Sequence, residues 1–239
     1  MPENLLIPSV DLRIASLEEY NRRQKKKAGF RGEHDDAPPC ITLSREFGCE
    51  AYPVAEHLRE LLIQKTGSEW VIMDKALLEE VSRRHNISED ILRSLGEKNK
   101  IFDEVMATFS PRWKTDRDHF KLLASYIISL ASQGNVIIVG RGSAIITAHL
   151  TNCHHFRLYG SIGFKSSSIA ARLKISLDEA SRLIEKKQAQ RDNFTNSFLG
   201  RNAGDLSYYE LLFNNDKSST KRIASTISQH VLFSAKQQG

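Results

Sequence analysis

Two short segments of the sequence have the composition of a phosphate-binding site. In the first, an apolar run ending at Leu43 leads into Ser44-Arg45-Glu46-Phe47-Gly48 and then into a segment of helical period. A helix N-terminus offers free N–H groups and a partial positive charge, so a loop between strand and helix can hold a phosphate. Pro53 suits the first helical position, where its missing N–H is no loss. An ordinary connection, with Arg45 and Glu46 in a surface ion pair, is the alternative.

The second segment is Gly140-Arg141-Gly142, which follows the apolar run of residues 136–139. The two glycines allow a tight turn that places Arg141 at the edge of a sheet. A guanidinium group there can bind a phosphate through two parallel hydrogen bonds, or it can pair with a neighbouring carboxylate. Asp74 follows a third apolar run in the same way, either as a helix cap or as a contact of a substrate or of Mg²⁺-bound water.

Alternating elements position these residues. From residue 40 onward, short apolar runs alternate with longer segments of helical period, as in βα units around a parallel sheet. Ser176 and Glu179 form a capping box at one helix start. The pattern predicts a three-layer α/β domain with its ligand at the carboxyl ends of the strands. We expect strands at residues 40–43, 70–73, 136–139, 155–159 and 209–213, and helices at 54–64, 75–84, 88–95, 117–133, 163–173, 177–192 and 218–233.

Residues 1–39 differ from the rest, with an amphipathic stretch at residues 12–20, a basic run at 22–27 and a polar stretch after it. We predict an N-terminal arm outside the domain of residues 40–239. It would pack on the outside or pair with another subunit in a homodimer, and it would be dispensable for the core. The basic run could touch nucleic acid, but a solvated helical face is the favoured interpretation.

Composition narrows the protein class. The 239 residues are 40% hydrophobic and 26% charged, with a net charge of +5, which is ordinary for a globular protein. Three cysteines without CxxC spacing exclude a disulfide framework and a zinc ribbon, and they fit a reducing cytoplasm. We predict no metal-ligating residues. No window approaches the about 18 apolar residues of a membrane span, and the first residues do not read as a signal peptide.

Five segments, in this order, resemble the cytidylate kinase-like family of P-loop nucleoside monophosphate kinases, and the resemblance covers roughly residues 40–232. Each motif alone has limited specificity, but their order and spacing together make the case. The segments are Ile41-Thr42-Leu43-Ser44-Arg45-Glu46-Phe47-Gly48, Met73-Asp74-Lys75-Ala76-Leu77-Leu78, Gly140-Arg141-Gly142, Phe156-Arg157-Leu158-Tyr159 and Asp205-Leu206-Ser207-Tyr208-Tyr209-Glu210-Leu211-Leu212.

The resemblance implies a P-loop NTPase-like fold with a five-stranded parallel sheet of order 2-3-1-4-5, an ATP site with Mg²⁺ and a facing nucleotide-acceptor site. Arg141 would contact the acceptor phosphate, with Asp74 beside the acceptor. A lid of about residues 177–204 would bring Lys187 or Arg191 to the transferring phosphoryl group, where Arg45 could supply further charge. The phosphate loop would include Ser44, Arg45, Glu46, Phe47 and Gly48.

The loop departs from a full P-loop. Aligning GxxxxGK[ST] on the strand–helix junction puts Arg45 and Glu50 at its glycines, Ala51 at its lysine and Tyr52 at its hydroxyl residue. The loop therefore lacks the cation for the β- and γ-phosphates and the hydroxyl for Mg²⁺. We expect slow ATP turnover at most, and we expect Glu50→Gly with Ala51→Lys to raise nucleotide affinity.

Two functions follow from these observations. The first is ATP-dependent phosphoryl transfer to a nucleoside monophosphate such as CMP, or to a similar small phosphate acceptor, in the cytoplasm. The second is a degenerate protein that binds a nucleotide or other anion, or serves as an interaction module, without efficient turnover. A nucleic-acid-binding role through the basic run at residues 22–27 is a third and weaker interpretation, and no membrane partner is expected.

Overall fold

The computed structural model describes residues 37–83 and 114–237, together with Ile14, Leu17, Glu19, Tyr20 and Arg22 of the preceding segment. The helix expected at residues 88–95 and the basic run lie outside the described residues, apart from Arg22. In the described part of the chain, no helix is both long enough and apolar enough to cross a membrane.

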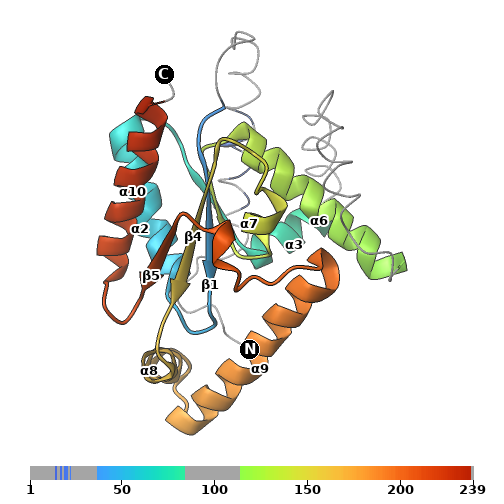
Figure 1. Ribbon diagram of the computed structural model, residues 1–239, viewed down its shortest axis with the longest axis vertical. Helices are drawn as coiled ribbons and strands as arrows, with labels where there is room; N and C mark the ends of the chain where they lie inside the picture. Colours follow the sequence, from blue (N-terminus) through green and yellow to red (C-terminus); the bar gives the residue numbers. More distant parts are fainter. Residues whose placement is uncertain are drawn as a thin grey trace.

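A five-stranded parallel sheet forms the centre of the molecule (Figure 1). Its order is β2-β3-β1-β4-β5, so the predicted fold and strand order are confirmed. Val136 and Cys153 lie opposite Cys40 in the two central pairings, which aligns the carboxyl ends of β3, β1 and β4. The strands are β1 (Cys40–Arg45), β2 (Val71–Met73), β3 (Val136–Val139), β4 (Cys153–Tyr159) and β5 (Leu211–Asn214).

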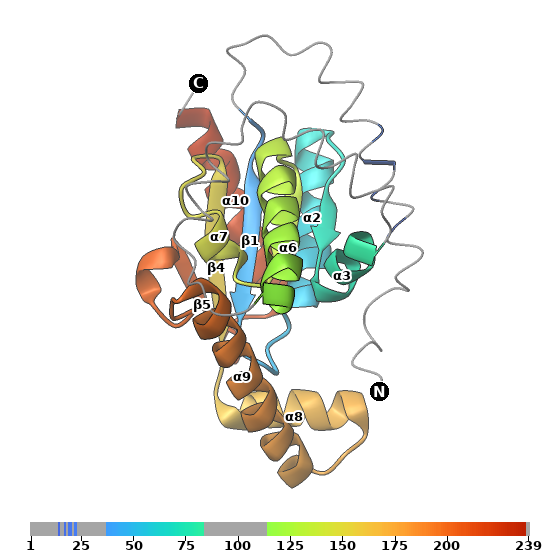
Figure 2. The same ribbon diagram turned by 90° about the vertical axis from the view of Figure 1, so that its right-hand side faces the viewer.

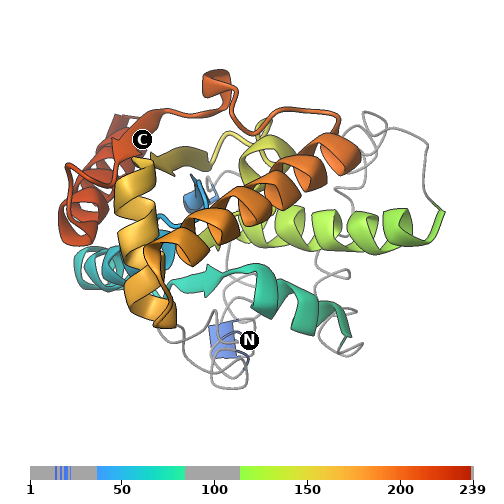
Figure 3. The same ribbon diagram turned by 90° about the horizontal axis from the view of Figure 1, so that it is seen from below.

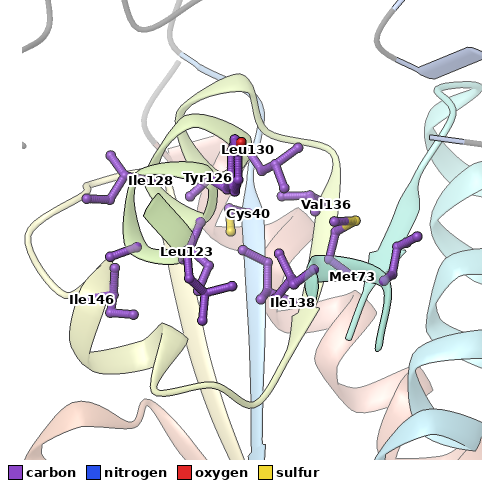
Figure 4. Packing of buried hydrophobic residues seen from close by; sticks show 14 of the residues in the cluster. Cys40, Met73, Leu123, Tyr126, Ile128, Leu130, Val136, Ile138 and Ile146 are labelled. Carbon is purple, nitrogen blue, oxygen red and sulfur yellow. The ribbon is translucent and has the colours of Figure 1, made fainter. Parts of the chain in front are cut away.

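Helices cover both faces of the sheet, which gives three layers (Figure 2). The helices α2 (Ala51–Thr66) and α10 (Thr220–Gln237) pack together on one face, over Ile41, Leu43 and Ile137. The helices α3 (Lys75–Arg83), α6 (Lys114–Gln133) and α7 (Ser143–Ile146) cover the other face, over Cys40 and Val136 (Figure 4). Successive strand residues point to opposite faces, so apolar side chains on both faces of these strands supply both cores.

The N-terminal segment belongs to one of these cores. Ile14, Leu17 and Tyr20 are buried in the same apolar cluster as α6 and β3, and the Tyr20 hydroxyl donates a hydrogen bond to the Gly134 carbonyl. The burial of these three side chains beside α6 argues against the expectation that this arm is dispensable. The boundary at residue 40 stays a prediction.

Two helices extend beyond the sheet. In Figure 1 the strands run downward, and α8 (Ile162–Leu173) and α9 (Leu177–Leu199) lie below their carboxyl ends. The capping box predicted at Ser176 and Glu179 is present. The first part of α9 packs on α8 and Phe47 through Ala180 and Ile184. Its last turns pack Phe194 and Phe198 on Phe120 of α6. Both ends of α9 are thus held, and the helix spans the end of the sheet (Figure 3).

Several helices and strands begin or end at residues other than those predicted from the sequence. The helix expected from residue 54 begins at Ala51, which places Pro53 at the third helical position rather than the first. The lid helix continues to Leu199, seven residues beyond its predicted end, because Phe194, Phe198 and Leu199 give its last turns an apolar face against α6. Tyr209 lies before β5 rather than within it, since a 3₁₀ turn at Leu206–Tyr208 precedes that strand.

Candidate functional site

A cleft of about 240 Å³ lies between the carboxyl ends of the strands and α9. Residues from the loop after β1, the turn after β3, β4, α3 and α9 line it. The predicted site residues Ser44, Arg45, Phe47 and Arg141 are brought together there, and so are Lys187 and Arg191 of α9. Ligand pockets usually measure about 300–1,000 Å³, so the size of this cleft suits a small ligand.

The lining is strongly cationic. Among the residues that the structure describes, six positively charged side chains line the cleft, together with the acidic Asp192. An excess of one charge in a concave site raises the local concentration of ions of opposite sign. The six come from five separate elements and are Arg45, Lys75, Arg141, Arg157, Lys187 and Arg191.

The turn after β3 fixes Arg45 and Arg141. Gly140, Arg141 and Gly142 have φ values of +79°, +60° and +68°, a left-handed conformation that glycine adopts without strain. A Cβ atom on Gly140 would lie 1.6 Å from Arg45 Nη1, so only glycine leaves space for this guanidinium. The Arg141 guanidinium lies 4.9 Å from the centre of the Phe194 ring on α9. The turn therefore places one arginine against the sheet and presents another to the lid helix.

The lid helix contacts the loop after β1 directly. The Arg191 guanidinium lies 4.9 Å from the centre of the Phe47 ring, and its Nη1 donates to the Arg45 carbonyl at 3.5 Å. One turn earlier, Gln188 Oε1 accepts a hydrogen bond from the Phe47 backbone N–H at 2.8 Å. These contacts fix α9 to the loop and direct its basic face toward the cleft.

The loop after β1 has protein partners where a P-loop would meet phosphate. Besides Phe47 N–H, the Glu50 N–H donates to Asn215 Oδ1 at 2.8 Å. Lys165 Nζ lies 2.7 Å from Glu46 Oε2, and a Cβ atom on Gly48 would lie 2.7 Å from Lys165 Cβ. Side chains of this chain thus contact the loop, and Glu46 and Gly48 do not line the cleft, so their predicted contact with phosphate stays a prediction.

Ala51, which stands where a P-loop has its lysine, is part of the hydrophobic core. Ala51 is 2% exposed and packs in the apolar cluster of α2 and α10. A lysine at this position would place its charge in the core, which argues against the gain in nucleotide affinity expected from Glu50→Gly with Ala51→Lys.

Burial and the neighbouring Glu46 charge raise the pKa of the Cys49 thiol to about 11. Cys49 is therefore a protonated thiol and not a nucleophile at neutral pH.

Asp74 and Arg157 follow or lie within strands that border the cleft. Asp74 is buried and caps α3, accepting a hydrogen bond from Leu77 N–H at 3.0 Å. The structure thus gives it the capping role that the sequence left open, and its neighbour Lys75 lines the cleft instead. Arg157 of β4 also lines the cleft and donates to the Ala203 carbonyl at 2.6 Å. The sequence contains a signal for Arg157, since a basic residue interrupts an apolar strand there.

The sheet order and the helical lid over its carboxyl ends define a protein with the P-loop nucleotide kinase fold. Residues 40–217 match the model of the cytidylate kinase-like family, and the chain belongs to this family. The match covers every described strand and all of α9, so the sheet and the lid are features of the family domain.

One solved structure supports the fold, and two more distant structures were also found. An uncharacterised protein from Eubacterium ventriosum has a TM-score of 0.63 at 18% identity, with 81% of this chain and 97% of that chain covered. Shikimate kinase from Bacteroides thetaiotaomicron has a TM-score of 0.43 at 12% identity, with 81% and 98% covered. Dephospho-CoA kinase from Campylobacter jejuni has a TM-score of 0.35 at 10% identity, with 81% and 97% covered. The fold comparison rests on the first of these. No curated protein matches the chain.

Proposed function

We propose that the cleft binds the phosphate of a nucleoside monophosphate, such as CMP, or of a similar small phosphate ester, and that the protein does not turn over ATP efficiently. The observation that carries this proposal is the set of six cationic side chains around one small cleft. The guanidinium group of an arginine can donate two parallel hydrogen bonds to two phosphate oxygens, and its positive charge attracts the phosphate. The cytoplasm, where thiols stay reduced, suits such a protein with three free cysteines.

The residues present do not fit ATP with Mg²⁺ in the loop after β1. A P-loop holds phosphates with free backbone N–H groups, a lysine and a hydroxyl that binds Mg²⁺. Here side chains take the N–H groups of Phe47 and Glu50, and Ala51 is packed in the core. The Glu46 carboxylate, although paired with Lys165, adds a negative charge beside this loop. These features favour phosphate binding in the cleft over binding of the ATP triphosphate at the loop.

Phosphoryl transfer is the second candidate function. One observation favours it, because Lys187 and Arg191 of α9 line the same cleft as Arg45 and Arg141. Cations on a lid over an acceptor phosphate can stabilise charge during phosphoryl transfer. The occupied loop opposes this function, since the donor nucleotide lacks its usual contacts there.

The proposal predicts that the phosphate group supplies most of the binding energy. Isothermal titration should show binding of CMP and at most weak binding of cytidine, which lacks the charge that the cleft recognises. Affinity for CMP should fall as salt rises, because exposed charge pairs are screened. Equal affinity for CMP and cytidine, or CMP affinity independent of salt, would contradict a phosphate-binding cleft.

A further inference from the structure

Three side chains that can ligate metals meet beside β4 and β5, and none of them lines the cleft. His154 is the second residue of β4, Glu210 directly precedes β5, and His230 lies on α10. The cluster is distinct from the cleft, although Tyr209, which directly precedes Glu210, lines the cleft. Sequence spacing does not reveal it, because the pairs are 56 and 20 residues apart.

The ligand atoms lie at distances close to those of a metal site. Glu210 Oε2 lies 3.1 Å from His154 Nδ1 and 2.6 Å from His230 Nε2, and all three ligand atoms lie within 4.8 Å of one another. Zinc bonds to histidine and carboxylate of about 2.0–2.2 Å place tetrahedral ligand atoms about 3.3 Å apart. A metal ion would therefore need only small side-chain shifts to replace the two hydrogen bonds.

Neighbouring groups already orient these ligands. The second Glu210 oxygen accepts a hydrogen bond from the His155 backbone N–H at 3.1 Å, and the Glu210 N–H donates to the His155 carbonyl at 2.9 Å. The His230 ring makes an edge contact with Phe156, at 5.7 Å between ring centres. Contacts of this kind around the ligands are a regular part of metal sites, because they reduce the reorganisation that binding requires.

The cluster is also accessible. The side chains of His154, Glu210 and His230 are 13%, 33% and 34% exposed, so an ion can enter and keep a water molecule as a further ligand. Two imidazoles and one carboxylate with an open position form a set that Zn²⁺ favours over Mg²⁺, which prefers oxygen ligands. We propose that His154, Glu210 and His230 form a Zn²⁺ site that joins α10 to the β4–β5 edge.

Titration of the untagged chain with Zn²⁺ tests this proposal. We expect one Zn²⁺ bound per chain through this site, no comparable binding of Mg²⁺, and a rise in thermal midpoint with Zn²⁺, because a ligand that binds the folded state stabilises it. Glu210→Gln and His230→Ala should each weaken Zn²⁺ binding about tenfold or more, since even substitutions in the outer shell cost about 10–100-fold. The control is His57→Ala, because His57 pairs with Glu60 at 4.0 Å on α2 and belongs to no three-ligand cluster among the described residues.

Cobalt gives a second readout in the unmodified protein. Co²⁺ at the site should produce visible absorption bands of a four- or five-coordinate ion, and Zn²⁺ should abolish them. Absence of the bands, no Zn²⁺ binding, or equal Zn²⁺ affinity in the wild type and Glu210→Gln would overturn the proposal and leave a hydrogen-bonded ion cluster. If either variant does not fold, His154→Asn and the cobalt spectrum decide the question.

Discussion

Replacing Leu17 by aspartate is expected to unfold the protein. Leu17 is fully buried in the core cluster that also contains Ile14, Tyr20 and residues of α6. Loss of a buried leucine side chain costs about 2–5 kcal/mol, and an unpaired buried charge adds several more. The total loss is comparable to the free energy of unfolding of a typical folded domain, which is about 5–15 kcal/mol. Urea unfolding followed by circular dichroism measures the change.

The matched control is Leu206→Asp, because Leu206 is 59% exposed and the substitution is the same. This variant should keep a midpoint close to that of the wild type. Deletion of residues 1–36 should resemble Leu17→Asp, since it removes the buried side chains of Ile14, Leu17 and Tyr20 together. A truncated protein with an unchanged unfolding midpoint would show that the arm is dispensable after all.

Removing two cleft arginines together should abolish useful CMP binding. Arg141 and Arg191 reach the cleft from the turn after β3 and from α9. Each charge-assisted hydrogen bond contributes about 1.5–3 kcal/mol, so losing two lowers affinity by about 10²–10⁴-fold if the effects add. We choose Arg141→Asn with Arg191→Gln, because Asn tolerates the φ of +60° at position 141 better than Ala does. Isothermal titration with CMP measures the loss.

The control double variant is Arg201→Asn with Arg182→Gln. Both residues are exposed and outside the cleft lining, and Arg182 lies on α9 like Arg191. The control removes the same net charge, so it should reduce CMP affinity only slightly. Equal losses in both double variants would mean that overall charge, and not the cleft, attracts the nucleotide.

Local patterns in the sequence were sufficient for the sheet and for much of the cleft. The apolar runs that became β1, β3 and β4 are buried on both faces, which is why they stand out against the helical segments. Arg45 is the last residue of β1 and Arg141 follows the neighbouring strand β3, so the parallel sheet alone brings them together. The strand order came from the family resemblance, because alternation of elements does not determine which strands pair.

What the sequence did not reveal depends on contacts between distant residues. Lys165 of α8 pairs with Glu46 and lies against Gly48, although 119 residues separate the two charges. The arm resembles a surface helix, because an amphipathic pattern does not show which core receives its apolar face. The meeting of His154, Glu210 and His230 likewise follows from the fold and not from any motif.

The central claim is that the cleft binds an acceptor-like phosphate while the loop after β1 is closed to ATP. The most direct test is titration of one preparation with CMP and with ATP plus Mg²⁺, followed by measurement of CDP formation when both are present. We predict that CMP binds, that ATP with Mg²⁺ does not bind measurably, and that CDP does not accumulate above the control without protein. Binding of ATP with Mg²⁺ together with steady CDP production would contradict this account and establish an active kinase.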